Sequence, residues 1–496
     1  MAVSFVLRLP AVRQPYWNPD EGYLATEAVS LAHGGRLYID VVDRKPPLVP
    51  WLYEVCFAVS RHHSLWLVRL CAVLAIALAA LYTAHLAANL FGLPAALPTG
   101  LLTIALTAVL PGPDTLAANF EVFMLPATAA AMYYGGRQRF FVAGLSVGLA
   151  TLCKQVGLAP LLPLLLSGLS QPTRRWRHTG SLVAGVLLPC ALAALITSPR
   201  AFLFWNFFAS GHYAALPPLV TMMRRAFMGL LPLLVALGPL AVLAWSVRRP
   251  PETPPRWPRA AACRVGAWAL SSACGVAAGF HFYGHYFLQL APPLALTAGL
   301  AFHHVSGGRT RVRRAPPRPF GPLRPLGGAA RWLGLRPRYA LGVACALLIA
   351  LGTTAVSLGQ APPAKDRTLA QVAAVEAHST RNERLFVWGM HPEVYWLSGR
   401  SPASPYLTSG ILTNFAGGGA SDRVGAHYAV PGTWHLLSAG LRTRPPCLLL
   451  DDSAGTPYSL ARYPLLAREV RRHYRPVAEA GGAVLYRRFR CAQPRR

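Results

Sequence analysis

Residues 17–50 read WNPDEGYLATEAVSLAHGGRLYIDVVDRKPPLVP, and this stretch is the most acidic part of a strongly basic chain. It contains five carboxylates, which are Asp20, Glu21, Glu27, Asp40 and Asp43. By contrast, the long segment from Val55 to Ala364 contains only Asp114, Glu121 and Glu252. That segment is apolar and interrupted by arginines, which is typical of membrane-spanning sequence. The acidic stretch therefore predicts a polar site that lies against a hydrophobic scaffold.

The composition excludes an ordinary soluble domain. The chain has 496 residues, of which 53% are hydrophobic and only 13% are charged, whereas soluble domains carry about 25% charged residues. The net charge of +30 could indicate a nucleic-acid-binding protein. However, the arginines cluster in short loops between apolar runs, as the positive-inside rule requires of a membrane protein. We therefore expect a polytopic α-helical membrane protein that does not bind nucleic acid.

The apolar runs predict both the spans and their orientation. Leu48–Ser60 is too short to cross a bilayer, so we expect it to lie in the interface as part of a first extracytoplasmic loop at 10–64. The basic loops at 137–139, 174–178, 248–264 and 309–338 then all face one side, the cytoplasm. If Leu48–Ser60 spanned instead, every later loop would change sides. The predicted spans are 65–91, 94–112, 118–135, 139–154, 156–170, 179–197, 225–247, 263–281, 286–305 and 339–358.

The composition becomes soluble after residue 360. We expect residues 1–360 to form the membrane domain, with a cytoplasmic basic loop at 306–338, and residues 361–496 to form a small extracytoplasmic α/β domain. Cys447 and Cys491 lie outside the apolar runs and could form a disulfide. The elements predicted for this domain are helices at 368–378, 392–398 and 463–474, strands at 385–388 and 447–450, and a strand pair that ends at Tyr486.

A helix is expected to begin at Asn18-Pro19-Asp20-Glu21, because Asn is a good N-cap and Pro fits the first helical position. It would end near His33, before Gly34-Gly35. Asp20 and Glu21 have two interpretations. They could complement the helix dipole, which contributes about 0.3–1 kcal/mol, or they could belong to a catalytic site together with Asp43 and Lys45.

Other unusual polar residues fall on the same predicted side of the membrane. Glu121 and Asp114 precede or begin a span, where they could be solvated helix-terminal acids or could position a substrate. Lys154 ends a short span, so it could extend to the lipid headgroups or bind an anion. The turn His281–Gln289, which contains His285 and Tyr286, could be an interfacial aromatic belt or part of a site.

Three motifs in the first loop resemble those of GT-C glycosyltransferases. They are D-E-G-Y at 20–23, G-x-x-x-Y-x-D at 34–40 and K-P-P-L-x-x-W-L at 45–52. The groups that they resemble most are the family 39 protein mannosyltransferases and the aminoarabinose transferases. This resemblance implies a GT-C-like fold and transfer of a sugar from a polyprenyl-phosphate donor to a hydroxyl outside the cytoplasm. The family has a full helix before its D-E pair, whereas this chain has only the apolar residues Met1–Leu9.

The resemblance assigns the catalytic base to the D-E pair, at Asp20 with Glu21 beside it, and phosphate binding to Lys45. It also implies that second-loop acids, Glu121 and Asp114, position donor or acceptor, and we add Asp43 because it lies close to Lys45 in the sequence. Lys154, His285 and Tyr286 are expected to complete the phosphate site.

The predicted protein is a hexosyl- or pentosyltransferase of the plasma (inner) membrane. Its partners would be a polyprenyl-phosphate sugar, membrane lipids and a lipid, glycan or protein acceptor, and it would need no metal or cofactor. The alternatives are a transporter or flippase of lipid-linked sugars and a non-catalytic membrane scaffold.

Overall fold

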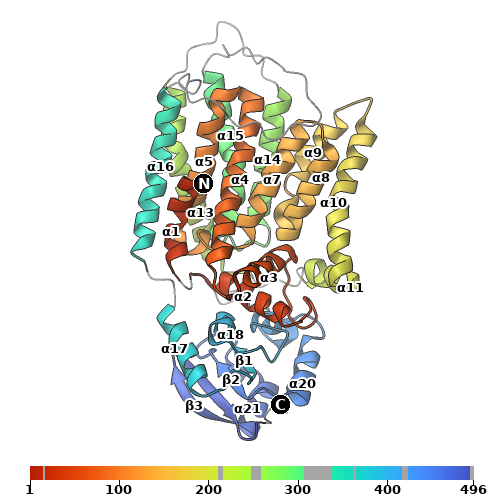
Figure 1. Cartoon of the computed structure of the whole chain (residues 1–496), viewed down its shortest axis with the longest axis vertical. Coiled ribbons are helices and arrows are strands. Elements are labelled where there is room, and N and C mark those ends of the chain that lie inside the picture. The colour runs from red at the N-terminus through yellow and green to blue at the C-terminus, as the bar shows by residue number, and fades with distance from the viewer. Residues whose placement is uncertain are drawn as a thin grey trace.

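A computed structural model describes residues 1–14, 17–209, 216–246, 259–305, 337–360, 365–415 and 423–491. A bundle of long helices stands over a small α/β domain, and two helices of the first loop, α2 (Pro19–Ala32) and α3 (Leu48–Ser60), lie between them (Figure 1). Most of the predicted basic loops at 248–264 and 306–338 lie outside the described residues. This combination of an apolar helical bundle with an α/β domain confirms the predicted fold class.

The bundle helices correspond to the predicted spans. Four of the described helices contain apolar segments long enough to cross a bilayer: α4 (Trp66–Phe91), α10 (Arg175–Thr197), α13 (Leu219–Trp245) and α16 (Pro337–Leu358). Their outward side chains are apolar: Leu195, Ile196 and Val220 are each more than two-thirds exposed, as expected of helices that face lipid. The bundle comprises α4 (Trp66–Phe91), α5 (Ala96–Ala108), α7 (Phe120–Gly136), α8 (Phe140–Cys153), α9 (Leu161–Leu169), α10 (Arg175–Thr197), α13 (Leu219–Trp245), α14 (Arg259–Ala277), α15 (Ala291–Val305) and α16 (Pro337–Leu358).

Several predicted spans are wrong in their details, and the differences matter for the site. Helix α5 ends at Ala108, before the end of the predicted span 94–112, and Asp114 lies in the short helix α6 (Gly112–Thr115) that follows. The run 286–305 begins with a 3₁₀ turn, η4 (Gly284–Leu290), which holds His285 and Tyr286. Helix α13 begins six residues before the predicted span at 225, so Arg225 lies inside the helix.

The N-terminal segment is also more helical than predicted. Helix α1 (Ala2–Arg13) extends past Leu9 and continues through Pro10. It packs against the bundle, where Ser4 Oγ donates to Val73 O at 3.0 Å and Arg8 Nη2 donates to Leu116 O at 2.6 Å.

Helix α2 begins and ends as the sequence predicts. Asn18 is the N-cap, and its Oδ1 accepts the backbone N–H of Asp20 at 2.8 Å. The helix ends before Gly34, whose φ of +83° is a conformation that glycine adopts without strain. Helix α3 spans the predicted thirteen residues. Both helices bury apolar residues in the main core, including Leu24, Val49 and Tyr53.

The α/β domain contains one four-stranded sheet in the order β1-β2-β4-β3. Strand β1 (Leu385–Trp388) runs parallel to β2 (Leu448–Asp451), while β3 (Tyr474–Ala480) and β4 (Ala483–Arg488) form an antiparallel hairpin. The hydrophobic strands β1 and β2 form the centre of the domain core. Cys447 and Cys491 are joined by a disulfide. The helices are α17 (Lys365–Ala377), α18 (Glu393–Ser398), α19 (Gly410–Thr413), α20 (Thr433–Thr443) and α21 (Pro464–His473); α19 and α20 were not predicted.

Candidate active site

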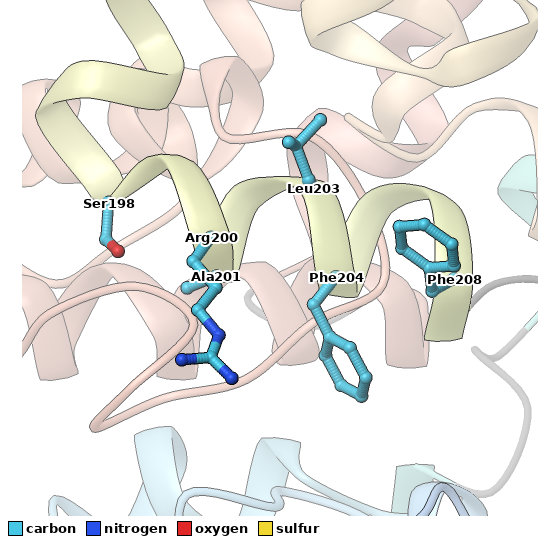
Figure 2. Close-up of a pocket in the computed structure, with 6 residues that line it drawn as sticks. All are labelled: Ser198, Arg200, Ala201, Leu203, Phe204 and Phe208. Atoms are coloured by element: carbon cyan, nitrogen blue, oxygen red, sulfur yellow. The ribbon is translucent and has the colours of Figure 1, made fainter.

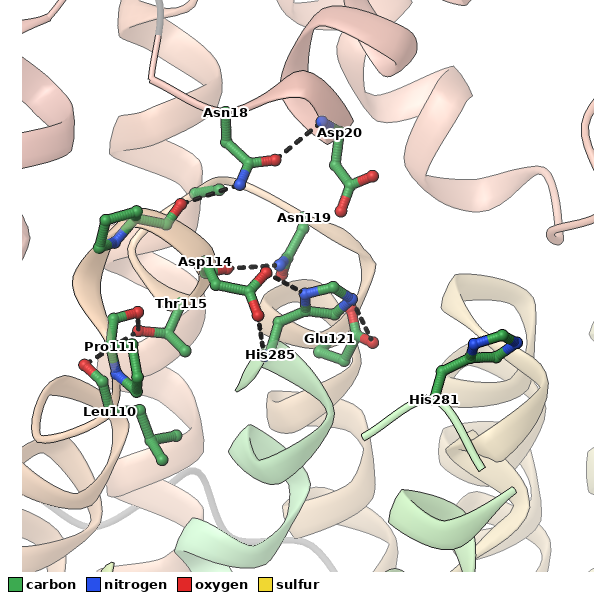
Figure 3. A network of polar contacts seen from close by, with 12 residues as sticks. Asn18, Asp20, Leu110, Pro111, Asp114, Thr115, Asn119, Glu121, His281 and His285 are labelled. Carbon is green, nitrogen blue, oxygen red and sulfur yellow. Dashed lines mark hydrogen bonds and ion pairs between the residues drawn. The ribbon is translucent and has the colours of Figure 1, made fainter. Parts of the chain in front are cut away.

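His285 lies between two carboxylates from different parts of the bundle (Figure 3). Its Nδ1 is 2.5 Å from Asp114 Oδ1, and its backbone N–H donates to Asp114 Oδ2 at 3.1 Å. On the other edge of the ring, Nε2 is 3.7 Å from Glu121 Oε1. Gly284 allows this approach, because a Cβ there would be 2.8 Å from Asp114 Oδ2. The short helix α6, the turn η4 and the start of α7 thus meet at one point.

The charge of His285 follows from this environment. Burial lowers the pKa of its imidazole, but the carboxylates of Asp114 and Glu121 outweigh burial, so the net pKa lies above the ordinary value. The ring is therefore a cation over a wider pH range than a free histidine.

Lys154 is the second cation of the cluster. Its Nζ forms an ion pair with Glu121 Oε1, and it lies 3.9 Å from the centroid of the Tyr286 ring. Lys154 follows the last residue of α8 in extended conformation. This break in the helix directs the side chain toward η4, and its ammonium is mostly buried instead of reaching to the headgroups.

Asp20 lies at the edge of this cluster. The neighbouring Asn18 donates from Nδ2 to Pro113 O at 2.8 Å, which fixes the start of α2 beside Asp114. The carboxylate is close enough for Coulombic interaction with Lys154 and His285. Within the described part of the chain its oxygens make no hydrogen bond or ion pair. A half-buried carboxylate near two cations, with its oxygens unoccupied, can accept a proton from a bound molecule.

The backbone around Lys45 is held by three side chains. Tyr38 Oη donates to Lys45 O at 2.8 Å, and Asn206 Nδ2 donates to Tyr38 Oη at 3.0 Å. Gln155 Nε2 donates to Arg44 O at 2.8 Å. The tyrosine of the G-x-x-x-Y-x-D motif therefore positions the lysine of the K-P-P motif.

The ammonium of Lys45 faces the same cluster. Its Nζ is 4.2 Å from the centroid of the Phe120 ring. It interacts electrostatically with both Glu121 and Lys154. Two lysines and a histidine thus surround Glu121, and such a concentration of cations suits a phosphate group.

Glu21 does not join this cluster. Its Oε2 is 2.7 Å from Arg69 Nη2, and its Oε1 accepts from Arg69 Nε at 3.1 Å and from the N–H of Ala118 at 2.8 Å. Glutamate and arginine are both buried. The geometry does not support the predicted catalytic role, because both oxygens are occupied, and we assign Glu21 to the packing of α2 against α4.

Asp43 and Glu27 form a separate acidic pair beside Lys45. Asp43 Oδ1 accepts from the N–H of Arg44 at 2.6 Å, whereas its Oδ2 and both carboxylate oxygens of Glu27 have no hydrogen-bond partner among the described residues. Burial, and then the charge of Asp43, raise the pKa of Glu27 well above its ordinary value against the opposing effect of Lys45. Asp43 therefore belongs to a buried acidic pair next to Lys45, and no hydrogen bond or ion pair joins it to Asp114 or His285 among the described residues.

Arg225, which was missed from the sequence, and Tyr283, which lies in the predicted turn His281–Gln289, extend the cluster. The Arg225 guanidinium carbon lies 4.6 Å from the Tyr283 ring centroid, and Nη1 donates to His281 O at 3.4 Å. The Tyr283 ring also stacks on His285, with centroids 5.7 Å apart. A signal for Arg225 is present in the sequence, because Arg224-Arg225 interrupts an apolar run, but it coincides with the border of a predicted span.

A pocket of about 540 Å³ opens on the outer face of the segment that carries Asn206 (Figure 2). This segment consists of α11 (Pro199–Leu203) and the π-helical turn η3 (Phe204–Phe208). Asn206 points inward to Tyr38, and its carbonyl accepts from Gln155 Nε2 at 3.2 Å. The segment that lines the pocket is thus hydrogen-bonded through Asn206 to Gln155, which follows Lys154 in the chain. Its lining is mostly apolar and comprises Ser198, Arg200, Ala201, Leu203, Phe204 and Phe208.

The described residues contain one group with metal-ligating geometry, Glu383 with Cys447 and Cys491, in the α/β domain. The two cysteines are already joined to each other, and Glu383 pairs with Arg487 at 2.8 Å. We assign no metal to this group. The expectation that the reaction needs no metal stays a prediction.

An apolar helical bundle stands over a small α/β domain, and its first loop brings an acid and the K-P-P lysine to a cationic cluster. Residues 44–205 match the family model described as dolichyl-phosphate-mannose-protein mannosyltransferase, a range that includes Lys45, Asp114, Glu121 and Lys154. Comparison with curated proteins gave no match.

Two solved structures of ArnT from Cupriavidus metallidurans resemble the chain over nearly its whole length. The form bound to undecaprenyl phosphate has a TM-score of 0.60 at 17% identity and covers 98% of this chain and 96% of that one. The apo form has a TM-score of 0.61 at 16% identity, with 97% and 95% covered. The predicted resemblance to GT-C glycosyltransferases is thereby confirmed.

Proposed function

We propose that this protein transfers a hexosyl or pentosyl group from a polyprenyl-phosphate donor to a hydroxyl acceptor on the extracytoplasmic side of the plasma (inner) membrane. The observation that carries the proposal is the placement of Asp20. Its carboxylate has no partner among the described residues, and it faces a cluster that contains Lys45, Lys154 and His285. A base on one side and several cations on the other are what glycosyl transfer from a phosphate requires.

The acceptor hydroxyl gives its proton to Asp20 as its oxygen attacks the anomeric carbon of the donor. The bond between that carbon and the phosphate oxygen breaks, and the lipid leaves as a phosphate monoester with one more negative charge than the donor had. Lys45 and Lys154 lie close enough to interact electrostatically with each other. Together they stabilise the negative charge that grows on the leaving phosphate. Arg225 extends the same cationic surface toward Tyr283.

The carboxylates of Asp114 and Glu121 have a positioning role in this scheme. Asp114 orients the His285 ring through two contacts, and Glu121 holds Lys154. Asp43 lies next to Lys45 and supports the loop rather than the reacting atoms. Tyr286, whose ring faces Lys154, covers the ammonium on its lipid side.

A lipid-linked donor agrees with two features. The ArnT structure with a similar fold was solved with undecaprenyl phosphate bound. In addition, the pocket beside Asn206 offers Leu203, Phe204 and Phe208 to an apolar chain, with Arg200 at its rim. An isoprenoid anchored there would contact the segment that Asn206 joins to Gln155, the neighbour of Lys154 in the chain.

The test is an in vitro transfer assay with the purified full chain and radiolabelled polyprenyl-phosphate sugars. Wild-type protein should transfer or hydrolyse the sugar, and Asp20→Asn should lower the rate about 10²–10⁴-fold, the usual contribution of a general base. The exposed Asp40, whose carboxylate pairs with Arg36 alone among the described residues, provides the matched control Asp40→Asn. Movement of the lipid between leaflets without turnover would instead identify a flippase, and neither activity would indicate a scaffold.

A further inference from the structure

The α/β domain contains a cluster of charged side chains that the reaction scheme does not use. His391 Nδ1 is 2.9 Å from Glu393 Oε1, and its Nε2 is 3.4 Å from Asp452 Oδ2. The other oxygen of Asp452 forms an ion pair with Arg367. We refer to these four residues as the His391 network. Glu393 is completely buried and Asp452 is nearly so, so their charges are not screened by water.

Helix α18, which carries Glu393 of this network, lies directly against α2, the helix that carries Asp20 (Figure 1). Gly22 of α2 touches Glu393 so closely that a Cβ at position 22 would lie 2.3 Å from Glu393 Cβ. One turn further along α2, Thr26 Oγ1 donates to Pro392 O at 2.9 Å. The turn 389–393 is thus packed against the first two turns of α2.

Two further contacts join the α/β domain to the first loop. Val42 N donates to Pro405 O at 2.9 Å, and Trp396 Nε1 donates to His63 O at 2.6 Å. These contacts are neutral hydrogen bonds, which do not change with pH. A third contact is a charged hydrogen bond, in which Lys365 Nζ donates to Gln14 Oε1 at 3.1 Å. The His391 network adds to this interface a histidine that lies between two carboxylates.

The charges around His391 come from three elements. Arg367 comes from α17, Glu393 from α18, and Asp452 from the segment after β2, with Asp451 and Tyr458 next to Asp452. With a protonated ring, two cations balance the Glu393 and Asp452 carboxylates. With a neutral ring, Glu393 and Asp452 both lose the cation that lies between them while they stay buried, which destabilises their arrangement.

We propose that His391 is a positioning residue for the reaction: its protonated ring holds the turn 389–393 against α2, and α2 in turn holds Asp20 at the cationic cluster. The role of Asp20 in this statement rests on the proposed function. The mechanical part, that the His391 network fixes α2, does not rest on it.

The direction of the pH effect follows from the surroundings of His391. Burial lowers its pKa, but the hydrogen bond and charge of Glu393, together with the charge of Asp452, outweigh burial and the repulsion from Arg367, so the net pKa is raised. A raised folded-state pKa means that the contribution is fully present below the unfolded value of about 6.5 and is lost as pH rises through the folded value. The attachment of α2 should loosen on the alkaline side.

The experiment is hydrogen–deuterium exchange on the full chain in lipid nanodiscs, followed on peptides from α2 and corrected for intrinsic exchange. In the wild type, protection of α2 should fall as pH rises from below about 6.5 to about 9, because the stabilisation that comes with the raised pKa of His391 is lost as the ring loses its proton. His391→Gln should show the low protection at every pH. The matched control is His435→Gln, which changes an exposed histidine of the same domain.

Glu393→Gln is the second variant, because it keeps the side-chain shape and removes one of the two carboxylates that raise the pKa of His391. Its loss of α2 protection should move to lower pH. Peptides from β1 and β2 serve as the folding control and should stay protected in all variants. Wild-type α2 protection in His391→Gln, or an unchanged pH midpoint in Glu393→Gln, would overturn the proposal.

The transfer assay separates this proposal from the proposed function. If both hold, His391→Gln should lower kcat more than it changes KM and should remove the alkaline decline of kcat. If the wild type shows the exchange behaviour but no transfer, the proposed function fails while the coupling between His391 and α2 stands. If transfer in His391→Gln keeps the wild-type pH profile, His391 does not position Asp20.

Discussion

Glu21→Gln and Asp20→Asn change adjacent residues of α2 and are expected to have opposite effects. The first should lower the stability of the fold, and the second should lower the rate of sugar transfer. Glu21 is fully buried and receives three hydrogen bonds: two from the Arg69 guanidinium, at 2.7 and 3.1 Å, and one from the Ala118 N–H at 2.8 Å. A glutamine keeps one acceptor oxygen. It leaves the buried Arg69 without its counter-charge.

Breaking a buried ion pair by removing one partner costs about 3–5 kcal/mol. Because the amide oxygen can take the place of Oε1 and still accept two of the three hydrogen bonds, we expect the lower end, about 3 kcal/mol. The double variant Glu21→Leu/Arg69→Met removes both charges together and should recover more than half of that loss. Asp20 has no such partner in the described structure, so Asp20→Asn should change the free energy of unfolding by less than about 0.5 kcal/mol.

Both properties can be measured on one preparation of the full chain in detergent. Denaturant titration gives the free energy of unfolding, and the polyprenyl-phosphate sugar assay gives the transfer rate. Glu21→Gln should lose stability but, in the fraction that remains folded, keep transfer. Asp20→Asn should keep the wild-type stability and lose transfer. A Glu21→Gln protein of wild-type stability that cannot transfer sugar would place Glu21 in the chemistry and refute our assignment.

Three further predictions concern the first loop. Gly22→Ala should cost about 1–3 kcal/mol, because the added Cβ meets Glu393 at 2.3 Å; unchanged unfolding would refute the tight contact. Glu27→Gln should abolish a loss of stability that the wild type shows as pH rises above about 4.3, since the raised pKa of Glu27 favours its protonated form; parallel stability–pH curves would contradict this. Tyr38→Phe should weaken binding of undecaprenyl phosphate, measured by isothermal titration, by about tenfold, because Lys45 loses the hydrogen bond that fixes its backbone; unchanged affinity would exclude this role.

Local sequence signals predicted the elements around the site well. The Asn-Pro-Asp-Glu start and the Gly-Gly end of α2 depend only on neighbouring residues, and both are where the sequence places them. Strand β1 is a run of buried apolar residues and matches its prediction. In contrast, α20 was missed because Gly440 and its threonines lower the helix propensity of a short amphipathic segment.

The meeting of distant polar residues was predictable only in outline. The argument from loop charges put Asp114, Glu121, Lys154 and His285 on one side of the membrane, and the structure brings them together. Which acid pairs with which base was not predictable. Glu21 and Arg69 are 48 positions apart, and no local pattern distinguishes Glu21 from Asp20. The His391 network likewise depends on how two domains pack, which single-sequence patterns do not encode.

The contact between Thr26 and Pro392 joins residues 366 positions apart, and this separation has a consequence during protein synthesis. At about 5–20 residues per second, the ribosome needs roughly 20 to 70 s to make the second partner after the first. Once His285 has been made, the chain carries every residue of the cationic cluster, but it still lacks the surface of the α/β domain that packs against α2. A chain that ends between His285 and Pro392 would therefore be incompetent, so that only molecules translated beyond Pro392 acquire a finished site.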